Sequence, residues 1–245
     1  VINSLGTKYK NSFNIQKIKK YKKFSNVRII GMGGSTLGTQ AIYSFLNHKI
    51  KKKFLFLDNL KPKRKIDNQK NLNLIISKSG NTIETIINVN IFIKKKDNNI
   101  FIVENNQNYL HNLAKKLKSE IFYHNNFIGG RYSVLSEVGM LPAELMGLNS
   151  RNFKQLNNIV KNKKFLNSLI ASVSSTLSFI KKKKFNSIIL NYDEKSHNLF
   201  SWYQQLISES LGKNNKGLLP VISTMPKDNH SVMQLYLDGF KNNFF

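Results

Sequence analysis

The chain has 245 residues, of which 39 are basic and 13 acidic, so its formal net charge is +26. It has no cysteine, which excludes disulfides, thiolate-bound metals and cysteine nucleophiles. No apolar run approaches the ~20 residues that span a bilayer, and no signal-peptide pattern follows Val1. We therefore expect a cytoplasmic protein without a membrane partner.

The positive charge consists almost entirely of lysine. Only four of the basic residues are arginines, and asparagine adds 34 residues, a composition typical of AT-rich coding sequences. Readout of bases and bidentate phosphate contacts both favour arginine, and no aromatic RNA-binding motif is present. We therefore expect solvated lysine faces and no nucleic-acid partner, although such a field would attract anionic substrates.

Short apolar segments alternate with longer segments of helical spacing, which predicts an α/β fold. Strands are expected at 27–30, 54–57, 72–76, 100–103 and 121–123, and helices at 37–46, 82–93, 109–117 and 134–148. Residues 1–148 should therefore form a doubly wound, flavodoxin-like α-β-α sandwich with a mostly parallel sheet.

Residues 149–245 predict a helical linker followed by a second, incomplete domain of the same kind. The linker is expected over 152–182, strands at 186–190 and 218–222, and helices at 199–210 and 231–237. Since two parallel strands rarely form a stable sheet, we expect residues 186–245 to be frayed, with exposed Phe and Leu side chains.

A glycine-rich turn follows the first expected strand. Gly31, Gly33, Gly34 and Ser35 precede a helix, an arrangement that suits close approach to a phosphate or a sugar. It is not the dinucleotide fingerprint, because Thr36 stands where the third glycine would be. The alternative is a tight turn that needs positive φ at glycine.

A second loop gathers hydroxyl groups at the start of a helix. Ser77, Ser79 and Thr82 lie within six residues, together with Lys78 and Gly80. A helix N-terminus favours an anion, and an ordinary N-cap needs only one of these hydroxyls. The loop therefore predicts an anion-binding site.

Four later residues are candidates for the catalytic site. Arg131 follows two glycines, and His230 opens a helix after a strand. Gln205 and Glu209 lie at i and i+4 and so share a helix face, where Glu209 could act as a general base. Surface roles, including a Glu209–Lys213 pair, remain open for these residues. The other histidines are interpreted as surface or capping residues (His48, His111, His124 and His197), and no group has metal-ligand spacing, so we expect no metal.

Taken together, these loops resemble the phosphoglucose isomerase family, whose members consist of two sugar isomerase (SIS) domains. The family's motifs occur in order as G-M-G-G-S-T-L-G (31–38), S-K-S-G-N-T-I-E (77–84), G-G-R-Y-S (129–133), W-Y-Q-Q-L-I-S-E-S-L-G-K (202–213), K-G-L-L-P (216–220) and D-N-H-S (228–231), the last with Asn for the usual Gln.

The resemblance implies interconversion of glucose 6-phosphate and fructose 6-phosphate through a cis-enediolate, a step of glycolysis and gluconeogenesis, with no cofactor. It implies phosphate binding by the hydroxyl loop and Lys78, and sugar contacts at Gly33, Gly34, Ser35 and Gln205. Glu209 would move the proton, Arg131 would stabilise the enediolate, and His230, supplied by the neighbouring subunit of a homodimer, would help open the ring.

Three alternatives remain open. They are a dual phosphoglucose/phosphomannose isomerase, a non-catalytic SIS module that binds sugar phosphates and, favoured by charge alone, a nucleic-acid binder. The family's C-terminal portion, with a lysine that assists catalysis, has no counterpart here. We therefore expect this chain to be a fragment of a longer, active enzyme, and we expect the fragment itself to have isomerase activity near zero.

Overall fold

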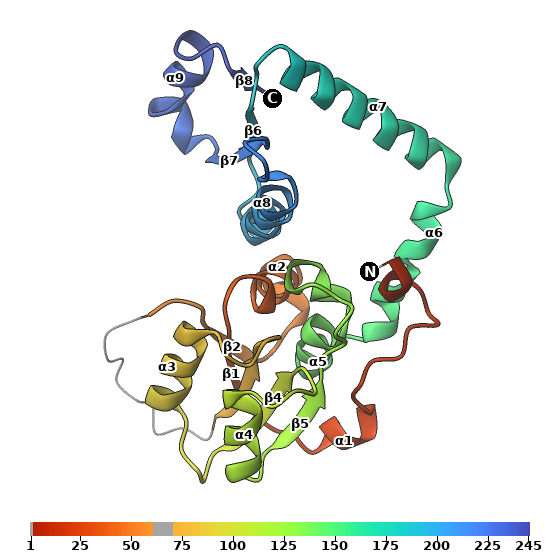
Figure 1. The fold of residues 1–245 in the computed structure, drawn as a ribbon, viewed down its shortest axis with the longest axis vertical. Coiled ribbons are helices and arrows are strands. Elements are labelled where there is room, and N and C mark those ends of the chain that lie inside the picture. Colours follow the sequence, from red (N-terminus) through yellow and green to blue (C-terminus); the bar gives the residue numbers. More distant parts are fainter. Residues whose placement is uncertain (1, 61–70) are drawn as a thin grey trace. The chain divides into compact units, whose positions relative to one another are not determined.

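The computed structural model describes residues 2–60 and 71–245 and divides the chain into two compact units. Unit 1 is Val1–Gln155 and unit 2 is Leu156–Phe245. Figure 1 shows the helices and strands of both units.

Unit 1 contains a five-stranded sheet whose paired strands are all parallel. The strand order is β2-β1-β3-β4-β5, and the strands are β1 (Asn26–Ile30), β2 (Lys53–Leu57), β3 (Leu72–Ile76), β4 (Asn98–Val103) and β5 (Glu120–Tyr123). The register pairs Ile30 with both Leu57 and Ile75. The prediction of a doubly wound parallel sheet is confirmed.

Helices cover both faces of this sheet, which is why most residues of its central strands are apolar. Every residue of β3 is buried, as a parallel strand between two helical layers requires. On one face, Ile75 and Phe101 pack against Val89 of α3 and Leu110 of α4. The helices are α1 (Ile15–Lys19), α2 (Leu37–Phe45), α3 (Ile83–Phe92), α4 (Tyr109–Lys116) and α5 (Glu137–Leu145), with α2 and α5 on the opposite side from α3 and α4 (Figure 1).

Short 3-10 helices make up much of the rest of unit 1. They are η1 (Ile2–Leu5), η2 (Gly33–Ser35), η3 (Asn47–Lys49), η4 (Gly130–Leu135) and η5 (Ser150–Leu156). The helix expected over 134–148 is therefore split: η4 ends at Leu135, Ser136 is extended with φ −97° and ψ −170°, and α5 begins at Glu137. Unit 1 continues to Gln155 because Ser150 and Lys154 of η5 are buried in it.

Unit 2 begins with α6 (Asn157–Val160) and the long helix α7 (Lys163–Lys181), as the predicted helical linker requires. It continues through β6 (Asn186–Asn191), η6 (Glu194–Ser196), α8 (His197–Leu211), β7 (Leu219–Thr224), η7 (Lys227–His230), α9 (Met233–Asp238) and β8 (Asn243–Phe244). The prediction of two strands is wrong here, because β8 pairs with β6 and gives a parallel sheet of order β7-β6-β8.

The sequence pattern missed β8 because two residues are too few to show any periodicity. The expected exposure of apolar side chains is confirmed: Leu237 is 66% exposed and Phe240 69%. Within the described part of the chain, we find no helix that is long and apolar enough to cross a membrane.

Candidate active site

The predicted loops of unit 1 lie where the winding of the sheet reverses. The chain leaves β1 toward β2 on one side, and β3, β4 and β5 follow on the other. Ligands of doubly wound sheets bind outside the carboxyl ends of the strands at this switch point. The glycine turn follows β1 and the hydroxyl loop follows β3, so the two loops flank the switch point.

The glycine turn packs directly against the loop that carries Arg131. Gly33 has φ +53°, a conformation that favours glycine. A Cβ on Gly34 would lie 2.4 Å from the carbonyl carbon of Gly130 and 2.6 Å from the backbone nitrogen of Arg131. The structure therefore brings Gly33, Gly34 and Ser35 beside Arg131, and a protein backbone fills the space next to Gly34 that we had expected the sugar to use.

Two of the predicted hydroxyl groups meet in the loop after β3. The Ser77 Oγ lies 3.2 Å from the Thr82 Oγ1, and Ser77 is buried while its backbone N–H donates to Ile102 of β4. Thr82 stands at the N-cap of α3, yet its side chain makes no capping hydrogen bond. Ser79 accepts instead from the backbone N–H of Asn81, at 3.3 Å. The loop thus holds a hydroxyl pair that the helix itself does not use.

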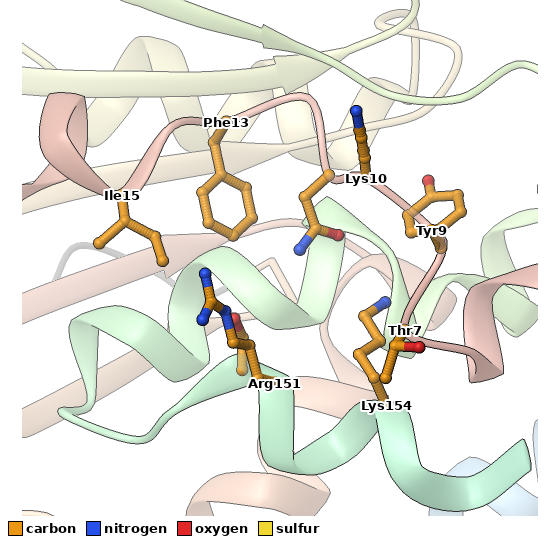
Figure 2. Close-up of a pocket in the computed structure, with 9 residues that line it drawn as sticks. Thr7, Tyr9, Lys10, Phe13, Ile15, Arg151 and Lys154 are labelled. Atoms are coloured by element: carbon orange, nitrogen blue, oxygen red, sulfur yellow. The ribbon is translucent and has the colours of Figure 1, made fainter.

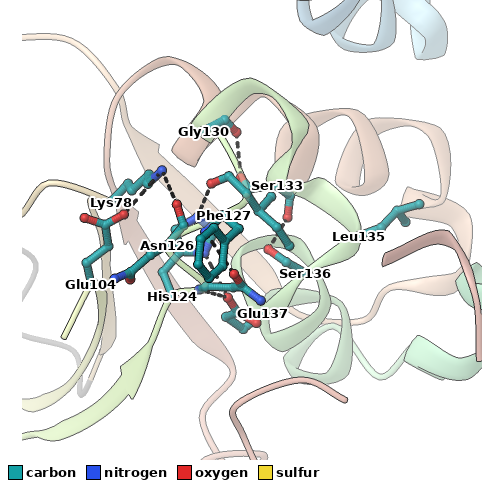
Figure 3. Close-up of polar contacts among 12 residues, drawn as sticks. Lys78, Glu104, His124, Asn126, Phe127, Gly130, Ser133, Leu135, Ser136 and Glu137 are labelled. Carbon is teal, nitrogen blue, oxygen red and sulfur yellow. Dashed lines mark hydrogen bonds and ion pairs between the residues drawn. The ribbon is translucent and has the colours of Figure 1, made fainter. Parts of the chain in front are cut away.

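Lys78 ties this loop to its neighbours (Figure 3). Its ammonium group lies 3.3 Å from Glu104 Oε1, after β4, and donates to the carbonyl oxygen of Asn126, after β5, at 3.0 Å. The backbone N–H of Glu104 donates in turn to the carbonyl oxygen of Lys78. Lys78 therefore orders three loops at the carboxyl edge of the sheet and shares its charge with a carboxylate.

Behind this edge lies a buried pair that sequence reasoning missed. His124 and Glu137 are each about 1% exposed at the side chain, and His124 Nδ1 lies 2.8 Å from Glu137 Oε1. His124 Nε2 faces the carbonyl oxygen of Ile128 at 3.0 Å. Both ring nitrogens thus face oxygen atoms. The interpretation of His124 and His111 as surface or capping residues is wrong, since both are buried.

Glu137 is the centre of this network. It also accepts from the Asn125 backbone N–H at 2.9 Å and from the Tyr9 hydroxyl at 3.1 Å. Burial alone would raise its pKa, but the hydrogen bonds from His124 and Asn125 outweigh burial and hold the pKa below its usual value. The signal in the sequence was a carboxylate inside the apolar stretch 134–148, because a buried charge needs a partner.

The remaining candidates belong to unit 2. Gln205 Nε2 donates to Glu209 Oε1 at 2.8 Å on α8, so the predicted shared helix face is confirmed. His230 ends η7, after β7 and before α9. Asp228 fixes this loop by accepting from Ser223 Oγ at 2.8 Å and from the Thr224 backbone N–H at 2.7 Å. Among residues 2–60 and 71–245, no group of three His, Asp or Glu side chains is arranged to hold a metal.

The fold is an α/β fold of the kind found in solved structures of phosphosugar isomerases. The structure matches that of a hypothetical protein from Thermus thermophilus with a TM-score of 0.81 and 24% identity, covering 99% of this chain and 64% of that one. It also matches tagatose-6-phosphate ketose/aldose isomerase from Escherichia coli (TM-score 0.61, 14% identity, 91% and 65% coverage). At these identities the likeness concerns the fold alone.

The family follows from the sequence. The profile described as phosphoglucose isomerase matches residues 12–222, and the chain belongs to this family. It is 35% identical to glucose-6-phosphate isomerase of Methanocaldococcus jannaschii and 30% identical to that of Campylobacter jejuni, in each case over 94% of this chain and 61% of the relative. The chain thus spans about three fifths of the length of these relatives.

Proposed function

We propose that this chain contributes the phosphate-binding loops and the proton-transferring base of an enzyme that interconverts glucose 6-phosphate and fructose 6-phosphate. The single observation that carries the proposal is the Ser77–Thr82 hydroxyl pair at 3.2 Å, next to the switch point and unused by the helix it precedes. The names of relatives at 30–35% identity give glucose 6-phosphate as the sugar that is isomerised, and moving its carbonyl from C1 to C2 gives fructose 6-phosphate.

The substrate phosphate would accept hydrogen bonds from Ser77, Ser79 and Thr82 at the start of α3, whose positive dipole end favours an anion. Lys78, which already forms an ion pair with Glu104, would add positive charge beside the phosphate. Gly33 and Ser35 would line the sugar, while Gly34 holds this turn against the backbone of Gly130 and Arg131. Arg131, after the glycines that pack on Gly34, would stabilise the oxygens that gain negative charge in the enediolate.

Glu209 would act as the base that shifts the double bond. Its carboxylate takes the proton from C2 of the open-chain aldose, and the C1 carbonyl oxygen becomes an enediolate oxygen. The protonated Glu209, which can exchange its proton with solvent, then protonates C1, while the O2 hydroxyl proton moves to O1 and C2 becomes the ketose carbonyl. Gln205 supports this role because its amide N–H already orients Glu209, while its Oε1 is buried with no hydrogen-bond partner among the described residues. That oxygen would accept a substrate hydroxyl.

The proposal includes a cytoplasmic homodimer in which His230 serves the neighbouring subunit during ring opening. An apolar stripe supports a covering partner: Phe165, Leu169, Val173 and Leu177 follow one another at i+4 spacing on α7 and are 43%, 48%, 51% and 54% exposed. Sedimentation equilibrium of the chain tests the assembly separately from the chemistry.

The experiment that tests the chemistry is deuterium exchange at C2 of glucose 6-phosphate in D2O, followed by NMR over hours, which detects turnover far below that of a coupled assay. Glu209→Gln keeps the shape and the Gln205 contact but removes basicity, so the exchange rate should fall at least ~100-fold. Binding of fructose 6-phosphate, measured by calorimetry, should stay within about threefold.

Glu194→Gln is the matched control, since it removes one carboxylate from another helix of unit 2 and should leave the exchange rate unchanged. Exchange that persists in Glu209→Gln would show that another group is the base. Failure of the unaltered chain to bind either sugar phosphate would contradict the proposed substrate.

A further inference from the structure

Unit 1 has a pocket away from the sugar-phosphate loops, formed by the N-terminal segment 7–15 and by η5. Its volume is about 440 Å³, within the range of small-molecule sites. Figure 2 shows the residues that line it, and they are Thr7, Tyr9, Lys10, Asn11, Phe13, Ile15, Ser150, Arg151 and Lys154. None of the loops assigned to the sugar phosphate contributes to this lining.

Buried hydrogen bonds fix the walls of the pocket. Lys154, only 6% exposed, donates to the carbonyl oxygens of Ser4, at 3.0 Å, and Leu135, and its ammonium group lies 4.6 Å from the centre of the Tyr9 ring. The Tyr9 hydroxyl donates to Glu137. Because these contacts hold the segment and η5 together, the pocket is preformed, and a ligand would not have to order it.

The lining is basic on one side, with no acidic residue among the described residues that line it. Arg151 and Lys154 are three residues apart in the 3-10 helix η5, where side chains at this spacing lie above one another. Lys10 lies on the facing segment, and its ammonium group extends away from Arg151 and Lys154 (Figure 2). Because the chain has 35 lysines, a lysine on the surface does not by itself indicate a binding site. A buried lysine beside one of only four arginines is a stronger indication of an anion-binding site.

The other side offers a ring and an unpaired acceptor. Phe13 is 8% exposed and is held edge-on by Phe122, with 6.3 Å between ring centres. Phe13 and Arg151 extend toward the same space from opposite sides (Figure 2). The Asn11 Oδ1 is buried without a hydrogen-bond partner in the described structure, a state that costs free energy unless a ligand donates to it.

We propose that this pocket binds a planar organic anion with donor groups, the chemistry of a nucleoside monophosphate. The planar part lies between Phe13 and the Arg151 guanidinium, which stacks on aromatic faces. The phosphate accepts from Arg151, and a hydroxyl or amino group donates to Asn11 Oδ1. The ligand acts at a place distinct from the sugar-phosphate loops.

AMP is the probe, titrated into the full 245-residue chain by calorimetry and by amide NMR with saturating fructose 6-phosphate present. We expect one site with a Kd below about 1 mM and shifts at residues 7–15 and 150–154. Adenosine, which lacks the charge, and inorganic phosphate, which lacks the ring, should each bind at least tenfold more weakly. Arg151→Gln should raise the Kd for AMP about tenfold or more.

Two further variants make the result decisive. Lys49→Gln removes one exposed cation elsewhere and should leave the Kd unchanged. Asn11→Leu removes the unpaired oxygen at nearly constant size, so it should raise the Tm of the free protein and still weaken AMP binding, a combination that a damaged fold cannot give. Shifts confined to residues 31–35 and 77–82, equal binding of inorganic phosphate, or no binding by the unaltered chain would each overturn the proposal.

Discussion

The two units contain the same kind of sheet but bury it to very different extents. In unit 1, strands β3 and β4 are buried almost completely, and helices cover both faces. In unit 2, Ile188 of β6 and Phe244 of β8 are buried, yet no residue of α7, α8 or α9 is. Parallel sheets are stable when both faces are covered, so the stability of this chain should reside in unit 1.

The largest expected effect tests that difference directly. Phe101 is fully buried between β3, α3 and α4, so Phe101→Ala should lower the free energy of unfolding of unit 1 by about 3–5 kcal/mol. The matched change in unit 2, Phe240→Ala, removes a ring that is 69% exposed and should cost less than ~0.5 kcal/mol. Urea denaturation followed by circular dichroism measures both.

Comparable losses from the two substitutions would mean that unit 2 has a core that its exposed side chains do not reveal. Amide hydrogen exchange provides an independent check, because β3 and β4 should exchange last and α9 first.

A smaller effect concerns the buried pair that supports the site edge of unit 1. Glu137→Gln replaces the carboxylate that takes part in hydrogen bonds with Tyr9, His124 and Asn125 and should cost about 2–3 kcal/mol. The pKa of Glu137 is lower in the folded chain than its usual value of 4.5. Its contribution is therefore present at neutral pH and is lost as the pH falls below 4.5 through the folded-state pKa.

Urea denaturation from pH 6 to pH 3 measures this loss as the difference between the unaltered chain and Glu137→Gln. The difference should shrink toward the acid end of the series. A constant difference would contradict the assignment of Glu137 as an ionised acceptor.

The smallest effect lies at the opposite end of the pH scale. Burial lowers the pKa of Lys154 to about 8, against the opposing charge of Glu137, while the unfolded-state value is 10.5. Between these values the unfolded chain binds a proton that the folded chain does not, so unit 1 should gain on the order of 1–2 kcal/mol between pH 7.5 and pH 9.5.

Lys154→Met should abolish this gain, although it also lowers stability at every pH by leaving two carbonyl oxygens without their donor. Burial also lowers the pKa of Lys52, which makes stability rise with pH in the same direction. The quantity to compare is therefore the difference in unfolding free energy between the unaltered chain and Lys154→Met at each pH. Equal slopes in both would show that Lys154 stays protonated in the folded state.

Sequence patterns predicted the parts of the fold that depend on local order. The mostly apolar run Leu72–Ile76 became β3 with the expected bounds, and the hydroxyl loop that follows it begins a helix as expected. The pairing of Gln205 with Glu209 followed from helix geometry alone.

Contacts between distant segments were not accessible in this way. His124 meets Glu137 only because β5 and α5 fold back on each other, and Tyr9 reaches Glu137 across 128 residues of sequence. Lys154 could not be distinguished among 35 lysines until its burial was known. The space beside Gly34 is a similar case, since its occupant, the backbone of Gly130 and Arg131, comes from the far end of unit 1.

That last contact has a consequence for anyone who wishes to alter the specificity of this enzyme family. With Gly34 and Gly130 in backbone contact, the two loops form one surface whose halves are encoded about a hundred codons apart. Libraries that randomise one loop while holding the other fixed will mostly sample collisions. Recombination that transfers both segments together from a relative preserves the fit, and should return folded variants far more often than transfer of either segment alone.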